Sequence, residues 1–76
     1  MAKYRCASAV EKIRNQFTYH PPKDDQAERY GIIRDAGKRF ALAIANATPP
    51  GLERDAAIAA VREAVMWANA AIACNE

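Results

Sequence analysis

A chain of 76 residues can form one small domain, in the size range where a single hydrophobic core is marginal. Eleven basic and nine acidic residues leave a net charge of +2, far from the basic excess of proteins that bind duplex nucleic acid. Apolar residues make up 51% of the chain, and much of that fraction is alanine, which favours close-packed helices over strands. The composition therefore predicts a small all-α protein and argues against a DNA- or RNA-binding regulator.

The two cysteines, Cys6 and Cys74, stand far apart, and no Cys-x-x-Cys or Cys/His cluster accompanies either of them. This spacing predicts reduced thiols, no metal site and no cofactor. No apolar run approaches the ~20 residues of a membrane span. The first residues also lack the apolar core of a signal peptide, so we expect a cytoplasmic protein with no membrane partner.

The first 16 residues predict a short amphipathic helix, which is followed by an elbow at residues 17–23. The apolar side chains of this helix recur every three or four residues, at Cys6, Val10, Ile13 and Phe17. In the elbow, Pro21 and Pro22 fix two φ angles and push the residues before them into extended conformations. The elbow therefore ends the helix and holds Tyr19 and His20 outside it.

Two long helices are predicted next, over residues 24–47 and 52–75. Asp24 and Asp25 stand where a helix favours an N-cap and first-turn carboxylates. Two prolines and a glycine within residues 48–51 predict a tight turn, after which the second helix returns antiparallel to the first. The stripe that should face the preceding helix consists of Ile58, Val61, Val65, Ala68 and Ile72. The sequence thus predicts one domain over residues 1–76, with a short leading helix and a long helical hairpin.

The segment 64–73 is apolar on almost every side, interrupted only by Asn69. A helix that is hydrophobic all round has to be covered all round, and a chain of this length cannot cover it. We therefore expect a homo-oligomer in which this half of the chain forms the interface, through Val65, Trp67, Asn69 and Ile72. Asn69 either bonds a partner copy and fixes the register or bonds within its own chain, and both readings stay open.

Residue types favour binding over catalysis. The chain has a single histidine, no arrangement of nucleophile and base, and no glycine-rich phosphate loop, so we expect no enzyme activity. Tyr19 and His20 offer flat faces for a nucleobase, and cations follow them at Lys23, Arg29, Arg34 and Lys38. A few cations beside aromatic rings suit a small phosphorylated ring compound better than a polymer. The alternative is that Tyr19 packs on the hairpin and the cations only solvate a helix face.

Two stretches of the chain carry a family resemblance. Residues 17–26 read Phe-Thr-Tyr-His-Pro-Pro-Lys-x-Asp-Gln, followed by Arg29-Tyr30 and Ile33-Arg34, and residues 64–73 form the apolar ending. Together they resemble the small phage proteins that carry the anti-CBASS sponge hairpin domain, over residues 10–76. The resemblance implies a helical hairpin, assembled into homohexamers, that sequesters cyclic oligonucleotide signals of CBASS immunity without cleaving them. It also implies a site of action in the cytoplasm of the infected bacterial host, and related anti-Thoeris sponges share the hairpin.

The resemblance further implies a ligand site shared between protomers. In it, Tyr19 stacks on a base of a cyclic dinucleotide such as cyclic GMP-AMP, and Arg34 contacts the ligand where relatives use lysine. Chemistry adds three further candidates, His20, Lys23 and Arg29.

One position departs from the family pattern. Cys74 stands where the family's ending has a basic residue that serves a second pocket for cyclic trinucleotides, so we expect weaker trinucleotide binding. The alternative function is a helical adaptor that binds a host protein through the same apolar surface.

Overall fold

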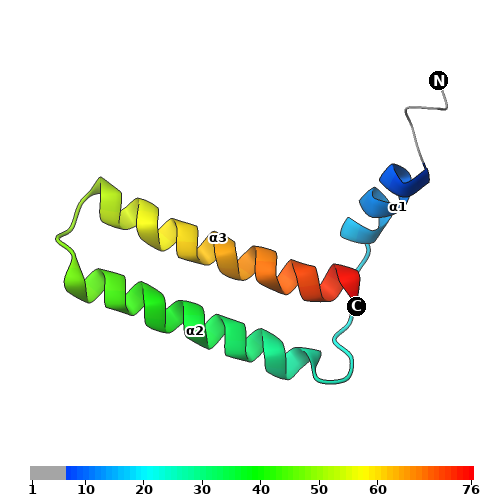
Figure 1. Ribbon diagram of the computed structural model, residues 1–76, viewed down its shortest axis with the longest axis horizontal. Helices are drawn as coiled ribbons and strands as arrows, with labels where there is room; N and C mark the ends of the chain where they lie inside the picture. Colours follow the sequence, from blue (N-terminus) through cyan, green and yellow to red (C-terminus); the bar gives the residue numbers. More distant parts are fainter. Residues whose placement is uncertain (1–6) are drawn as a thin grey trace.

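A computed structural model describes residues 7–76, and the first six residues, with Cys6 and the start of the predicted leading helix, lie outside this part. Within it the chain forms three helices, α1 (Ala7–Gln16), α2 (Gln26–Ala47) and α3 (Leu52–Asn75), and no strand. The long helices α2 and α3 lie side by side and antiparallel (Figure 1). The predicted all-α fold, with a short helix before a helical hairpin, is confirmed.

The start of α2 differs from the prediction. Asp24 has a φ of 52°, in the left-handed region, so the helix cannot include it and begins at Gln26. Asp25 occupies the N-cap position but makes no side-chain capping bond, and its carboxylate accepts a hydrogen bond from Arg29 Nε at 3.2 Å. The prediction that Asp24 and Asp25 supply a side-chain cap and first-turn carboxylates is therefore wrong, and the acidic residue of the first turn is Glu28.

Gln26 closes the start of α2 instead. Its backbone N–H donates to the Lys23 carbonyl at 2.9 Å, and the Lys23 N–H donates to Gln26 Oε1 at 3.2 Å. This exchange resembles a capping box, in which a side chain three residues into the turn reaches back to the backbone. Gln26 is only 2% exposed, so the connection between elbow and helix is built around a buried polar side chain.

The turn between α2 and α3 follows from local residue types. Both the N–H and the hydroxyl of Thr48 donate to the Ile44 carbonyl, at 3.1 and 2.7 Å, and close the last turn of α2. Gly51 is the N-cap of α3, and its carbonyl accepts the Asp55 N–H at 3.1 Å. Acidic residues in the first turn of α3 complement the helix dipole. The bounds of α3, Leu52–Asn75, are the same as those predicted.

Gly37 sets how closely the two long helices approach each other. A Cβ atom added at Gly37 would lie 2.5 Å from Cγ2 of Val65 and 3.7 Å from Cγ1 of Val61. Both valines belong to the predicted facing stripe of α3, and Val61 is 9% exposed. The seam of the hairpin is therefore narrowest where α2 has no side chain.

Alanine substitutions at two glycines of α2 should act in opposite directions. Gly31→Ala meets no atom within 4 Å, so it should stabilise the hairpin by about 0.5–1 kcal/mol through helix propensity. Gly37→Ala gains the same propensity but collides with the stiff Val65 side chain, so we expect a net loss of roughly 1 kcal/mol or more. Urea unfolding followed by circular dichroism at one protein concentration measures both. Equal stability of the two variants would show that the seam tolerates a methyl group.

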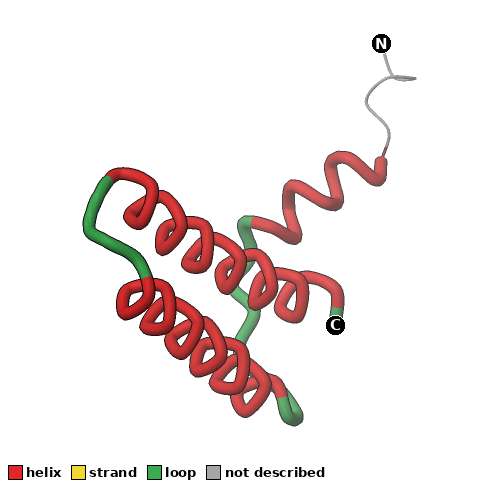
Figure 2. Tube along the Cα trace, turned by 60° about the vertical axis from the view of Figure 1, so that its left-hand side comes forward, coloured by secondary structure: helices red, strands yellow, loops and turns green. Residues whose placement is uncertain are grey.

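In the described part of the chain, residues 7–76, the hairpin is a single layer with both faces uncovered. The protein measures 13 Å along its shortest axis, and its radius of gyration of 16.9 Å exceeds the roughly 11 Å of a compact chain of this length. Figure 2 shows that α1 points away from the hairpin and covers neither face. Of residues 9–76, only Gln26 and Val61 are buried. The large apolar side chains that stay mostly exposed are Ile13, Phe17, Tyr19, Ile32, Phe40, Leu42, Leu52, Met66 and Trp67.

Helix α3 is the one described helix that is long and apolar enough to cross a membrane, judged by length and composition alone. The prediction that no segment approaches such a span is therefore wrong. Core helices of soluble proteins pass the same test. Arg62 and Glu63 lie near the middle of α3, where charged side chains are costly in a bilayer. Coverage by other protein surface fits this helix better than coverage by lipid.

Candidate ligand-binding site

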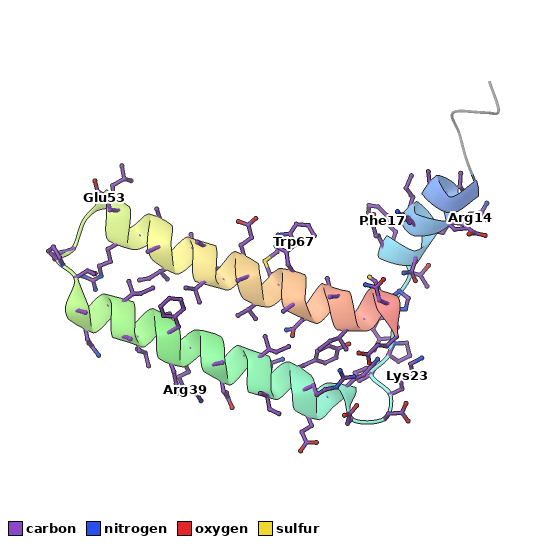
Figure 3. The ribbon with its side chains drawn as sticks, in the orientation of Figure 1. Arg14, Phe17, Lys23, Arg39, Glu53 and Trp67 are labelled. Carbon is purple, nitrogen blue, oxygen red and sulfur yellow. The ribbon has the colours of Figure 1, made fainter. Side chains whose placement is uncertain are left out.

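Hydrogen bonds tie the elbow to the end of α3. The side-chain amide of Asn15 donates to the Cys74 carbonyl at 2.6 Å, and Lys23 Nζ donates to the Glu76 carbonyl at 2.8 Å. His20 Nε2 lies 2.8 Å from the Asn15 carbonyl, and because a carbonyl oxygen only accepts, this contact requires a proton on Nε2. Figure 3 shows Lys23 beside the last turn of α3. Hydrogen bonds therefore hold the elbow at its start, through Asn15, and at its end, through Lys23. Tyr19 lies between these two points.

Arg29 is engaged by two carboxylates. Its Nη1 donates to Glu76 Oε2 at 2.9 Å, its Nη2 pairs with the other oxygen of Glu76, and its Nε pairs with Asp25. Gln26 Nε2 adds a bond to Glu76 Oε1 at 3.3 Å. The hydrogen bonds from Arg29 and then Gln26 lower the pKa of Glu76, and the bond to Glu76 raises the pKa of Arg29. Arg29 therefore joins α2 to the end of α3.

Acid should loosen this connection. Because the pKa of Glu76 is lowered in the folded chain, its contribution to stability is present above the ordinary value of 4.5 and is lost as the pH falls through the lowered value. We expect Glu76→Gln to unfold at lower urea concentration at pH 7 and to lose less stability than the wild type as the pH falls below 4.5.

The partner variant provides the control. Arg29→Gln should flatten the acid limb in the same way, and the double variant should lose little more than Arg29→Gln alone, because that change already removes the bond to Glu76 together with the pair to Asp25. Urea midpoints at pH 7 and in acid measure the effect. A Glu76→Gln variant with the acid dependence of the wild type would contradict the assignment.

The elbow borders a cavity of about 660 Å³, lined by residues 20–23, the final residues 73–76, Asn15 and Gln26. Tyr19 is not part of that lining and is 81% exposed. The alternative in which Tyr19 packs on the hairpin of its own chain is therefore wrong. Its ring is available to a ligand or to a second copy of the chain.

Arg34 lies at a different place from the elbow. It lines a cavity of about 330 Å³ between α2 and α3, together with Lys38 and with Arg62, a residue that no motif in the sequence marks. Arg62 lies 28 positions after Arg34, and only the antiparallel register of the hairpin brings the two to one cavity. Neither the elbow cavity nor this one contains both Tyr19 and Arg34.

The predicted interface residues occupy different positions. Trp67 is 67% exposed on the side of α3 that faces away from α2 (Figure 3), and its Nε1 donates to Glu63 Oε2 at 3.2 Å. Val65 instead lies in the seam opposite Gly37, and Ile72 is half-buried. Trp67 is therefore the residue that best probes an interface without disturbing the hairpin.

Asn69 carries a buried acceptor without a partner. Its Oδ1 is buried and accepts no hydrogen bond from the part of the chain that the structure describes. Leaving such a group unpaired costs about 1–3 kcal/mol. Of the two readings of Asn69, a bond from a partner copy now has this observation in its favour.

The three helices define a small helical-hairpin protein. Its elbow carries an exposed tyrosine and leads into the hairpin. Comparison with protein-family models matches residues 9–73 to the Acb2/Tad1 hairpin domain. The match covers most of the chain, so the chain belongs to this family of sponge-type proteins that counter anti-phage defence, and the resemblance in the elbow and the ending is confirmed. Comparisons with curated proteins and with solved structures gave no match.

Proposed function

We propose that this protein is a non-catalytic sponge that binds cyclic dinucleotides, such as cyclic GMP-AMP, and blocks CBASS immunity in the cytoplasm of the infected bacterial host. The observation that carries the proposal is Tyr19, 81% exposed at an elbow that hydrogen bonds hold against α3, in a chain of the sponge family. Stacking on such a ring accepts any base. The sponge acts by mass action, so it has to be abundant and bind the signal more tightly than the effector does.

The active form in this proposal is a homo-oligomer, a hexamer by analogy with the family. Three features support association: the single-layer hairpin, the exposed Trp67 and the unpaired Oδ1 of Asn69. A cavity of about 640 Å³, lined in part by Phe17, Trp67 and Ala71, is a second apolar surface that a partner copy can fill. Association would also bring Tyr19 of one copy near Arg34 of another, as a shared pocket requires.

The five proposed ligand residues divide into two groups. Tyr19 and Arg34 are exposed and contact the ligand in our proposal. His20, Lys23 and Arg29 already have partners within the chain, so they hold the elbow in place and reach the ligand only where it borders the elbow cavity. Cyclic trinucleotides should bind more weakly, because the Cys74 thiol cannot replace a guanidinium fork at phosphate.

Isothermal titration with a panel of cyclic di- and trinucleotides tests the proposal. We expect tight binding of at least one cyclic dinucleotide, weaker binding of trinucleotides, and recovery of unchanged ligand by chromatography after the protein is denatured. Cleaved ligand would overturn the non-catalytic assignment. If no cyclic nucleotide binds, including cyclic ADP-ribose isomers, the sponge proposal fails and a helical adaptor that binds a host protein through its apolar surface takes its place.

A further inference from the structure

We infer that Arg34, Lys38 and Arg62 form one anion-binding groove between α2 and α3, which we call the cationic groove, and that it takes a phosphate group of the ligand. The inference assigns Arg62, on α3, to the ligand site. The identity of the ligand, a cyclic dinucleotide, rests on the proposed function. The cationic groove itself rests on the residues that line the cavity.

The antiparallel register brings the three cations together. Arg34 and Lys38 are four residues apart on α2, so they project from one side of that helix. Gly37 lies opposite Val61 and Val65 of α3, which places Arg62 across the seam from Lys38. All three cations line the same cavity of about 330 Å³ and are exposed at its rim. A phosphate in the cationic groove can therefore be reached from both helices.

The floor of the cationic groove is apolar and small. Gly37, Ala41, Val61 and Val65 line it, with the exposed Met66 at one side. Because Gly37 lacks a side chain, the helices approach closely and leave a shallow surface instead of a projecting group. An apolar floor below a cationic rim suits a ligand with a sugar or base edge beside a phosphate, which is the chemistry of a nucleotide.

The charges in the cationic groove are not balanced by the chain. Among the described residues no Asp or Glu lines the cavity, and Arg34 and Lys38 form a like-charged i,i+4 pair, an arrangement that destabilises a helix. Asp35 stands three residues before Lys38, but the described residues show no salt bridge between them, and Arg62 has no acidic residue three or four positions away on α3. Arg29 provides the contrast, because in the described part of the chain it pairs with both Asp25 and Glu76. Three like charges at one cavity repel one another, and a bound phosphate would offset that repulsion by attracting all three.

Arg62→Gln tests the inference, with Arg39→Gln as its matched control. Arg39 is an exposed cation of α2 that projects away from α3 (Figure 3), so its loss changes the net charge equally without touching the cationic groove. In titrations with cyclic GMP-AMP, we expect Arg62→Gln to weaken binding roughly tenfold or more and to reduce its salt dependence. Arg39→Gln should stay within about twofold, a residual charge effect. Light scattering checks that both variants keep the wild-type oligomer.

Two outcomes of this titration are decisive. A wild type that binds cyclic GMP-AMP while Arg62→Gln binds it equally well overturns the inference and leaves the sponge proposal intact. If no cyclic nucleotide binds the wild type, inorganic pyrophosphate becomes the probe, and backbone amide shifts in NMR spectra become the measurement. Shifts at Gly37 and Arg62 that disappear in Arg62→Gln would then support the cationic groove although the sponge proposal has failed. Pyrophosphate that leaves both amides unchanged would overturn the inference as well.

Discussion

Replacing Tyr19 by alanine should weaken the binding of cyclic dinucleotides by roughly 5- to 150-fold, the equivalent of about 1–3 kcal/mol for one stacked base. The helix content and the oligomer mass should stay as in the wild type, because Tyr19 is 81% exposed and contributes little packing within its own chain. Isothermal titration gives the affinity, and circular dichroism and light scattering give the two controls.

Tyr19→Phe distinguishes the contribution of the aromatic ring to ligand binding from that of the hydroxyl group. Phenylalanine keeps the flat face that stacks on a base, so this variant should bind within a few-fold of the wild type. His20→Ala is a second comparison, because His20 supports the elbow through the Asn15 carbonyl and does not offer an exposed ring. Wild-type affinity in Tyr19→Ala would remove Tyr19 from the site and leave the cationic groove as the remaining candidate.

Replacing Trp67 by lysine should dissociate the oligomer into chains of 8.3 kDa. A buried aromatic side chain contributes 150–250 Å², and Trp67 is 67% exposed in the single chain. Burying the exposed part of the Trp67 side chain in an interface therefore contributes about 2.5–4 kcal/mol for each copy. A charged side chain at the same place would lose this contribution. Size-exclusion chromatography with light scattering measures the mass over a range of protein concentrations.

Lysine is chosen as the replacement for Trp67 because it should not destabilise α3. Glu63 lies four residues before it, and a Glu-to-Lys pair at this spacing supports an α-helix. The control Trp67→Phe keeps the apolar surface and should keep the assembly. An unchanged mass for Trp67→Lys would refute the proposed interface.

The two variants also test whether the ligand pocket is shared. Tyr19 and Arg34 do not line a common cavity within one chain. If association brings them together, Trp67→Lys should lose ligand affinity although every ligand residue is still present. Full affinity in a dissociated chain would instead place the whole site within one protomer.

The sequence by itself determined the helices and the family, because the signals for both are local. The elbow at residues 17–23 separates α1 from α2, Thr48 and the residues after it separate α2 from α3, and three- and four-residue periodicity marks the seam. The exception is the start of α2. There Asp24 enters the left-handed region, and the buried Gln26 donates a hydrogen bond to Glu76, a residue 50 positions away that no local pattern can reveal.

Only the tertiary structure decided what the polar residues do. Lys23, Arg29 and Arg34 are alike in the sequence, yet the first two are occupied by Glu76 and Asp25 while Arg34 meets Lys38 and Arg62 at the cationic groove. The physical reason is that charge pairing depends on distance in space, and the antiparallel register of the hairpin brings together residues that the chain keeps far apart. The same register leaves both faces of the hairpin uncovered, which is why we expect a second copy of the chain to complete the fold.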